Sequence, residues 1–188
     1  MSQDFQIQSR CIDVLAEITR QHSGVLEGRV RIQKIMYLLR RSSPEILDGV
    51  NFYYHHYGPF SSTVVDSVMG ALSWRVLEQR VETFSDDKQR YEYILGPGAD
   101  ESAEPLDLHS KAVVTHLVDH VKTEHWRTLE LAATIDFLAQ SEQLSHEEAT
   151  TKALRLKPLC TEYEARARAL LERLCLPPLQ ERAIVTGH

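Results

Sequence analysis

Apolar residues recur at helical spacing in two segments of the first half of the chain. Residues 4–21 carry one apolar stripe, and in residues 29–41 (RVRIQKIMYLLRR) the i, i+3, i+4, i+7 positions are Ile32, Ile35, Met36 and Leu39. Both patterns predict an amphipathic helix that buries one face and exposes the other. The Ser-Ser-Pro sequence that follows the second segment is typical of a helix end.

Shorter patterns in the first half predict strands and one further helix. The aromatic run NFYYHHY (51–57) favours a strand, which Gly58 and Pro59 should end. A helix then runs to about Trp74. The segments VLEQRVETF and QRYEYIL flank the polar turn SDDK (85–88), and this arrangement predicts a β-hairpin.

The second half is predicted to be helical after a polar loop. Residues 96–105 (GPGADESAEP) contain two Gly, two Pro and three acidic residues, which is typical of a solvated linker. Helical patterns then cover residues 107–123, 125–140, 146–156 and 162–175. The last two are expected to begin with capping boxes, formed by Ser145 with Glu148 and by Thr161 with Glu164.

The predicted fold class is therefore α+β and mainly α-helical. A helix–helix–strand–helix–hairpin block, which is winged-helix-like, precedes a four-helix C-terminal cap. The domain organisation that we expect is an α+β core, an acidic linker, a helical extension packed on the core, and a loosely held tail. These parts span residues 1–95, 96–105, 106–176 and 177–188.

Composition and charge restrict the function classes. The 188 residues are 43% hydrophobic and 26% charged, as in ordinary globular proteins. We expect no membrane segment, because no apolar run approaches ~18 residues, and no signal peptide at the N-terminus. The three cysteines favour a reduced, cytoplasmic compartment. The net charge is −6, and residues 1–95 have 11 basic against 12 acidic side chains, so a domain-wide basic surface for nucleic acid is not expected.

No recognisable catalytic or metal motif is present. The sequence contains no GxSxG elbow, phosphate-binding glycine loop or CxxC pair. The segment HEEAT (146–150) has Thr where a zincin helix has its second His. His109, His116 and His120 share one helix face, but only the last two are close enough to bind one ion, and no Cys or acidic partner is evident. We therefore predict no catalytic residues, no metal and no cofactor.

The segment 29–41 and the turn at 57–60 are the candidate binding features. Between Gly28 and Ser43 there are five cations and no acid, and a helical projection places Arg29, Gln33, Lys34, Tyr37, Arg40 and Arg41 opposite the apolar stripe. This face either binds an acidic or phosphate-bearing surface or is a solvated exterior. The sequence YYHHYGPFSS is either a strand–turn–helix joint or a binding spot rich in aromatic anchors.

These two segments resemble one known family. RIQKIMYLL (31–39) and the pattern F-x-Y-x-x-Y-G-P-F-S (52–61) resemble the Panacea (SocA-like) antitoxin domain, and are most similar to its YwgA-type relatives. The resemblance covers about residues 28–95 and, more loosely, 129–174. The matching residues are Gln33, Lys34, Tyr37, Tyr57, Gly58, Pro59, Phe60 and Ser61. The resemblance implies a small cytoplasmic protein of prokaryotic defence or toxin–antitoxin systems, without catalysis, that acts by binding a toxin or effector.

Two functions follow as hypotheses. In the first, the chain is a non-catalytic protein-interaction module that regulates a partner through Arg29, Arg31, Gln33, Lys34, Tyr37, Arg41, Tyr57, Gly58, Pro59 and Phe60. In the second, it is a winged-helix-like nucleic-acid-binding regulator. The hairpin carries three cations against four acids, and only one helix is evident between the first strand and the hairpin, so any nucleic-acid binding should be weak. The partner and the oligomeric state stay open.

Overall fold

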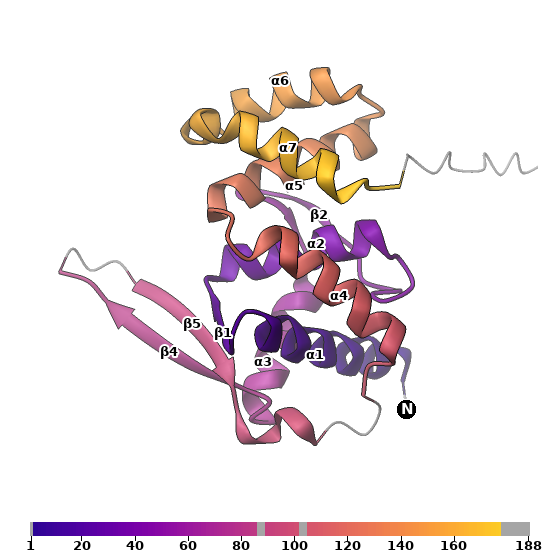
Figure 1. Ribbon diagram of the computed structural model, residues 1–188, viewed down its shortest axis with the longest axis vertical. Helices are drawn as coiled ribbons and strands as arrows, with labels where there is room; N and C mark the ends of the chain where they lie inside the picture. Colours follow the sequence, from indigo (N-terminus) through magenta and orange to yellow (C-terminus); the bar gives the residue numbers. More distant parts are fainter. Residues whose placement is uncertain (1, 86–88, 102–104, 178–188) are drawn as a thin grey trace, which may run out of the picture.

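The computed structural model describes residues 2–85, 89–101 and 105–177 (Figure 1). The first part of the chain forms α1 (Gln3–Gln21), β1 (Val25–Glu27), α2 (Arg29–Ser42), β2 (Tyr53–His55), β3 (Gly58–Phe60), α3 (Ser62–Ser73), β4 (Leu77–Thr83) and β5 (Gln89–Leu95). The 3-10 helix η1 (Pro97–Asp100), α4 (Leu108–Val121), α5 (Trp126–Glu142), α6 (His146–Leu156), the 3-10 helix η2 (Pro158–Tyr163) and α7 (Glu164–Leu174) follow. The predicted mainly helical α+β class is confirmed.

A strand that the sequence pattern did not reveal completes the sheet of the N-terminal block. β1 is only three residues long, too short for an alternating pattern, yet it pairs antiparallel with β5 through Val25–Ile94 and Leu26–Tyr93 and gives the order β1-β5-β4. Two helices, α2 and α3, therefore lie between the first strand and the β4–β5 hairpin. The expected single helix between residues 51–57 and the hairpin is α3; counted from β1, and with β2 and β3 set apart, the block has the helix–strand–helix–helix–hairpin order of a winged helix.

Residues 51–60 form a hairpin and not the single predicted strand. β2 pairs with β3 through Tyr53–Phe60 and His55–Gly58, so the chain turns at His56 and Tyr57 and continues as a strand through Gly58. The expected strand end was wrong because Gly58 adopts φ +81°, a value that only glycine reaches without strain, and this conformation lets the chain leave the turn in extended form. The hairpin is inserted between α2 and α3.

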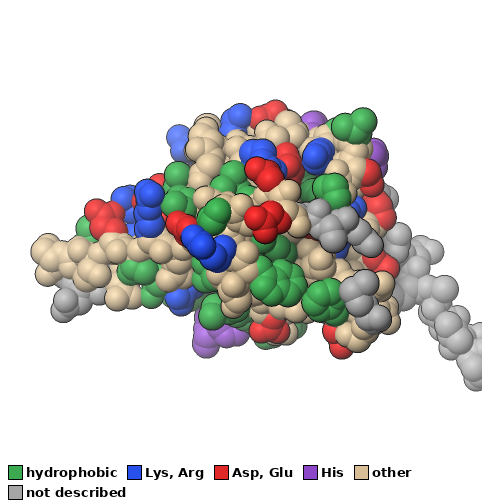
Figure 2. Space-filling model, turned by 90° about the horizontal axis from the view of Figure 1, so that it is seen from below, with side chains coloured by type: hydrophobic (Ala, Val, Ile, Leu, Met, Phe, Trp, Pro, Cys, Tyr) green, Lys and Arg blue, Asp and Glu red, His purple; other side chains and the backbone are tan. Residues whose placement is uncertain are grey.

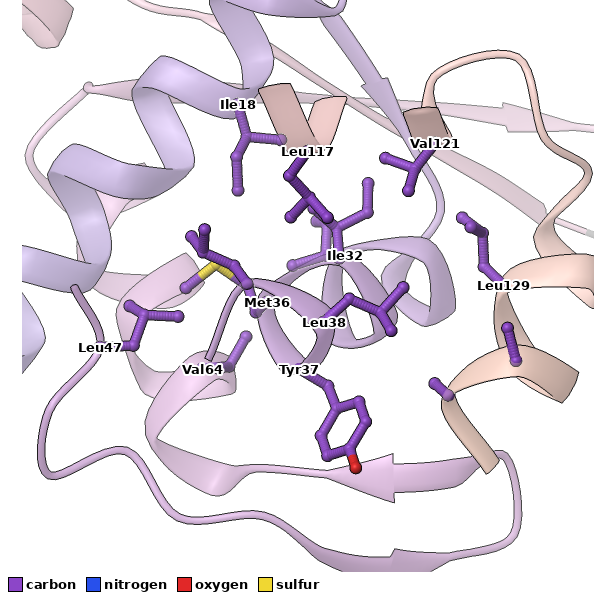
Figure 3. Close-up of a cluster of buried hydrophobic side chains, with 14 of the residues drawn as sticks. Ile18, Ile32, Met36, Tyr37, Leu38, Leu47, Val64, Leu117, Val121 and Leu129 are labelled. Atoms are coloured by element: carbon purple, nitrogen blue, oxygen red, sulfur yellow. The ribbon is translucent and has the colours of Figure 1, made fainter. Parts of the chain in front are cut away.

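Helix α2 is the centre of the core. Eight consecutive residues from Ile32 to Leu39 are buried. Helix α2 packs against α4, α5, β1 and β3, so neither of its faces reaches solvent along this stretch. Figure 3 shows side chains of α2 among Ile18 of α1, Val64 of α3, Leu117 and Val121 of α4, and Leu129 of α5. Buried apolar side chains form one cluster from α1 to α7.

The C-terminal helices largely follow the sequence pattern. The capping box at Ser145 and Glu148 is confirmed. The one predicted at Thr161 and Glu164 was wrong, because Pro158 starts a 3-10 helix through Tyr163, and α7 begins only at Glu164 without a side-chain cap. No helix in the described parts of the chain is long and apolar enough to cross a membrane.

The segment between the two halves is more structured than a solvated linker. Residues 97–100 form η1, and Gly98 is buried beside the carbonyl oxygen of Trp74, which an added Cβ atom would approach to 2.6 Å. Residues 102–104 of the predicted linker and residues 178–188 of the predicted tail lie outside the described residues.

Candidate functional site

The middle of the predicted basic binding face of α2 is buried, so the expectation that the whole face is exposed was wrong. Gln33, Lys34 and Tyr37 are buried, with 7%, 1% and 4% of their surface exposed, and Gly58 and Pro59 of the turn are buried as well. The helical projection assumed that only one side of α2 would be covered. Helix α5 and strand β3 cover the other side, a tertiary contact that spacing within the helix does not encode.

Three arginines of α2 that were predicted to contact a partner, Arg29, Arg31 and Arg41, are engaged by the protein itself. The guanidinium of Arg29 lies 3.8 Å from the ring centre of Tyr91 on β5. Arg31 donates to the carbonyl oxygen of Glu124, just after α4, at 2.7 Å. Arg41 pairs with the buried carboxylate of Asp136 on α5 at 2.8 Å. Of the three, Arg29 is exposed and the others are half-buried, so these cations fasten α2 to its neighbours.

Gln33 and Lys34 of α2 bond to the backbone at the end of the β2–β3 hairpin, on its buried side. The Gln33 amide donates to the Ser61 carbonyl at 3.0 Å and accepts from the Ser61 amide at 2.9 Å. The two bonds satisfy the backbone N–H and C=O of Ser61, as a neighbouring strand would. The Lys34 ammonium donates to the Pro59 carbonyl at 2.5 Å. The two residues therefore fix the chain immediately after the glycine turn.

A second lysine holds the other side of the turn. Lys157, between α6 and η2, donates to the carbonyl of His56 and forms a salt bridge of 2.9 Å with Glu130 on α5. The side chains of both partners in this bridge are only 5% exposed. Cys160 lies beside them, with its Sγ atom 3.8 Å from a Glu130 carboxylate oxygen. We call Lys34, Glu130 and Lys157 the lysine clamp.

The clamp supports the turn and does not present a reactive group. Burial lowers the pKa of Lys34 to about 7, with Glu130 raising it and Lys157 lowering it further. Burial and the Glu130 carboxylate raise the pKa of Cys160 to about 11, which keeps the thiol protonated and unreactive. The Lys34 ammonium is buried and donates to the Pro59 carbonyl oxygen, so its place is beneath the turn.

Tyr37 and Asp136 form a second buried link between α2 and α5. The Tyr37 hydroxyl donates to Asp136 at 2.5 Å, and Arg41 donates to the same carboxylate. Burial and the neighbouring carboxylate raise the pKa of Tyr37 well above its ordinary value, so the phenol stays neutral. The Tyr37 ring also packs edge-on against Phe52, which leads into the hairpin, with 5.3 Å between ring centres.

The outer side of the clamped hairpin is aromatic and exposed. Tyr53, Tyr54 and Tyr57 are 50%, 40% and 53% exposed. The rings of Tyr53, Phe60, His55 and His56 form a row, in which successive ring centres lie 5.4, 5.1 and 4.9 Å apart. Tyr54 and Tyr57 lie toward Lys157, whose ammonium is 6.0 and 5.7 Å from their ring centres. We call the aromatic residues of the hairpin that reach the surface, on either side, the aromatic surface: Tyr53, Tyr54, His55, His56, Tyr57 and Phe60.

The aromatic surface contains two of the four residues predicted for the turn and four residues that were not predicted as contacts. Of the four predicted turn residues, only Tyr57 and the half-buried Phe60 reach the surface. In a regular strand His55 and His56 would point to opposite faces, but their ring centres lie 4.9 Å apart because His56 lies in the turn, where strand alternation ends. Tyr53 and Tyr54 belong to the segment YYHHYGPFSS that the sequence offered as a possible binding spot, but they were not among the predicted contact residues.

The elements that would contact DNA in a winged helix have little positive charge. Helix α3 contains no Lys or Arg, and its exposed residues include Val65, Asp66 and Met69. On the β4–β5 hairpin, Arg90 pairs with Glu82 at 2.5 Å and with Glu92 at 3.4 Å. The hairpin tip at Asp86, Asp87 and Lys88 lies outside the described residues.

The histidines of α4 come close in one pair only. The rings of His116 and His120 are edge-on, with centres 4.8 Å apart. Within the described residues, no group of three or more His, Cys, Asp and Glu side chains is arranged to hold a metal ion.

Comparison with known proteins adds no assignment to this geometry. No protein-family model matches the chain, and a search of curated proteins gives no match either.

Proposed function

We propose that the protein is a non-catalytic interaction module that binds a partner protein through the aromatic surface. One observation carries the proposal: three tyrosines are 40–53% exposed on a hairpin whose backbone is fixed from below. Tyrosine supplies a large apolar ring and a polar hydroxyl, and is enriched among residues that dominate protein interfaces.

The lysine clamp makes this surface suited to binding. Lys34 and Lys157 hold the Pro59 and His56 carbonyls, and Gln33 holds both backbone groups of Ser61. A partner therefore meets a loop that is already ordered. Ordering a flexible loop on binding would cost about 0.5–1.5 kcal/mol for each immobilised side chain, and the clamp removes part of that cost before the partner arrives.

An antitoxin-like or defence-accessory role in the cytoplasm of a prokaryote is the form of this function that we favour. Its support is the resemblance of residues 31–39 and 52–61 to the Panacea domain. In the folded chain, Gln33 and Lys34 of the first segment bond to the backbone of the second. The two segments thus form one joint, in which the proposed role of Gln33 and Lys34 is to hold the hairpin in place for the partner and not to contact it.

The test is co-purification with the product of a neighbouring gene. We expect Y53A/Y57A to lose the partner while the thermal midpoint stays nearly unchanged, because both rings are half exposed. Phe84→Ala, which removes another exposed ring (43% exposed) next to β4, serves as the control and should retain the partner. Equal retention by both variants would exclude the aromatic surface as the contact.

Nucleic-acid binding is the second candidate, favoured by the winged-helix order of α1 to β5. Binding through phosphate contacts weakens steeply as salt increases. A titration with random duplex DNA at low and moderate salt separates the two functions. Absence of binding at low salt would eliminate this candidate, whereas a salt-dependent complex would favour it over the protein partner.

A further inference from the structure

One edge of the three-stranded sheet is uncovered along the β4–β5 hairpin. β4 is the outer strand in the order β1-β5-β4, and the hairpin projects from the helical body (Figure 1). From Glu78 to Thr83 every side chain of β4 is exposed. The pairing with β5 continues without a bulge from Leu77 to Thr83, and this stretch contains no proline. A regular, uncovered strand edge of this length can pair with a further strand.

The backbone groups of alternate residues of β4 point to this open edge. In an antiparallel pair, every second residue bonds to a given neighbouring strand. The Gly96 amide donates to the Val76 carbonyl at 2.9 Å, and this pair continues the register of β4 with β5. The even-numbered residues of β4 therefore bond to β5. The N–H and C=O groups of Gln79, Val81 and Thr83 point away from β5, to the open edge.

The side chains of the even-numbered residues form a charged face on the hairpin. Arg80 and Glu82 of β4 lie opposite Glu92 and Arg90 of β5. Arg90 pairs with both acids, with Glu82 at 2.5 Å and with Glu92 at 3.4 Å. Among the described residues, no carboxylate forms an ion pair with Arg80. Figure 2 shows basic and acidic side chains together on the projecting arm, at the left of the view. An acid from outside the chain can therefore pair with Arg80.

We infer that β4 pairs antiparallel with β4 of a second copy of the chain, in a two-fold register centred on Val81. The copies then exchange backbone hydrogen bonds through Val81 with Val81 and through Gln79 with Thr83, the residues whose N–H and C=O groups point to the edge. Arg80 of each copy lies opposite Glu82 of the other, so unlike charges meet twice across the axis.

Two other registers that use the same backbone groups oppose like charges. With the axis at Arg80 the two copies of this arginine face each other, and with the axis at Glu82 the two glutamates do. Like charges directly opposite each other destabilise a strand pair. The axis at Val81 instead extends the charged face into a row of alternating sign across four strands, formed by Glu92, Arg80, and the Glu82 and Arg90 of the second copy.

The register with its axis at Gln79 is closed by η1. It would bring Thr83 of the second copy opposite Arg75, whose carbonyl oxygen already accepts a backbone amide of η1 at 2.9 Å. With the axis at Val81 the strands meet beyond this contact. The two Val81 side chains, each 45% exposed in the single chain, then pack together on the face that also carries Tyr91. The inference does not depend on the aromatic surface, which lies on the separate β2–β3 sheet.

Proline at position 81 tests the edge. Val81→Pro removes an N–H that points to the second copy and none that bonds to β5, and edge strands tolerate proline in this orientation. Sedimentation velocity at a series of protein concentrations should show a monomer–dimer equilibrium for the parent. Because the two-fold axis removes a hydrogen bond twice, the dissociation constant of V81P should rise about tenfold or more. Gln89→Pro, whose N–H points away from β4, is the matched control and should leave the dissociation constant unchanged. A parent that is monomeric at every concentration, or equal constants for V81P and the parent, would overturn the inference.

Charge variants test the register. R80E and E82R each oppose like charges at both contacts of the homodimer, so each variant alone should be monomeric. Their equimolar mixture opposes unlike charges again and should form a heterodimer. Dimerisation of E82R alone, or failure of the mixture to associate, would refute the register centred on Val81. A complex that V81P weakens but that forms only with an unrelated chain would make another protein the occupant, which also refutes the inference.

Discussion

Glu130 offers the sharpest test of how the hairpin is held. Its carboxylate is the counter-ion of Lys157, at 2.9 Å, and it is the negative charge that raises the pKa of Lys34. Glu130→Gln preserves the shape and size of the side chain but removes the charge. Two buried ammonium groups would then be left without an anion, a state that costs far more than the loss of one hydrogen bond.

The expected loss follows from the burial of the pair. Breaking a buried ion pair by removing one partner costs about 3–5 kcal/mol. For a chain of this size, 1 kcal/mol corresponds to about 2–4 °C in the thermal midpoint, so Glu130→Gln should lower it by roughly 6–20 °C. The pH should be held near 6, where Lys34, with its pKa of about 7, carries its charge.

The same helix supplies a matched control. Glu142 of α5 also pairs with a lysine, Lys152, but the two side chains are 38% and 44% exposed. Glu142→Gln should therefore cost less than about 1 kcal/mol. Urea denaturation followed by circular dichroism gives both free energies of unfolding. Equal losses for the two variants would show that Glu130 is not a buried counter-ion, and the clamp would have to be abandoned.

Two further predictions concern the same turn. Burial lowers the pKa of Lys34 from its ordinary 10.5 to about 7, so above pH 7 the unfolded chain binds more protons than the folded chain. The free energy of unfolding should therefore rise from pH 6.5 to 8.5. An equal rise of the urea midpoint in a Lys34→Met variant would contradict this assignment. Gly58→Ala should lower the free energy of unfolding by about 2–6 kcal/mol, from left-handed backbone strain and overpacking. The φ angle of Gly58 is +81°, and the new Cβ atom would lie 2.3 Å from the Thr134 hydroxyl oxygen. Gly24→Ala, with φ +83° and open space around it, should show only the strain, and an equal loss in both variants would exclude the contact.

Local sequence patterns determined the elements but not their exposure. The spacing of Ile32, Ile35, Met36 and Leu39 predicted α2 almost to the residue. It also predicted an exposed face, and there it failed, because α5 is contributed by residues about a hundred positions further along the chain. Lys34 shows the difference most clearly: it lies on the polar stripe of the helix, yet only 1% of its surface is exposed.

The candidate site, too, has parts that the sequence predicted and parts that depend on contacts between distant segments. The Gly-Pro turn and its aromatic neighbours were visible in the sequence because Gly and Pro have strong conformational preferences of their own. The three-residue strand β1 and the turn at His56 and Tyr57 were not, because each is stabilised by partners distant in the chain.

By itself, the sequence determined the helices, the β4–β5 hairpin, the acidic character of the chain and the Gln33–Lys34 and Gly58–Pro59 segments. Only the tertiary structure decided that Lys34 holds the hairpin and that the arginines of α2 fasten this helix to its neighbours, whereas the tyrosines of the hairpin are exposed. The physical reason is that burial of a charge depends on which distant carboxylates and carbonyls surround it, and no local periodicity encodes those neighbours.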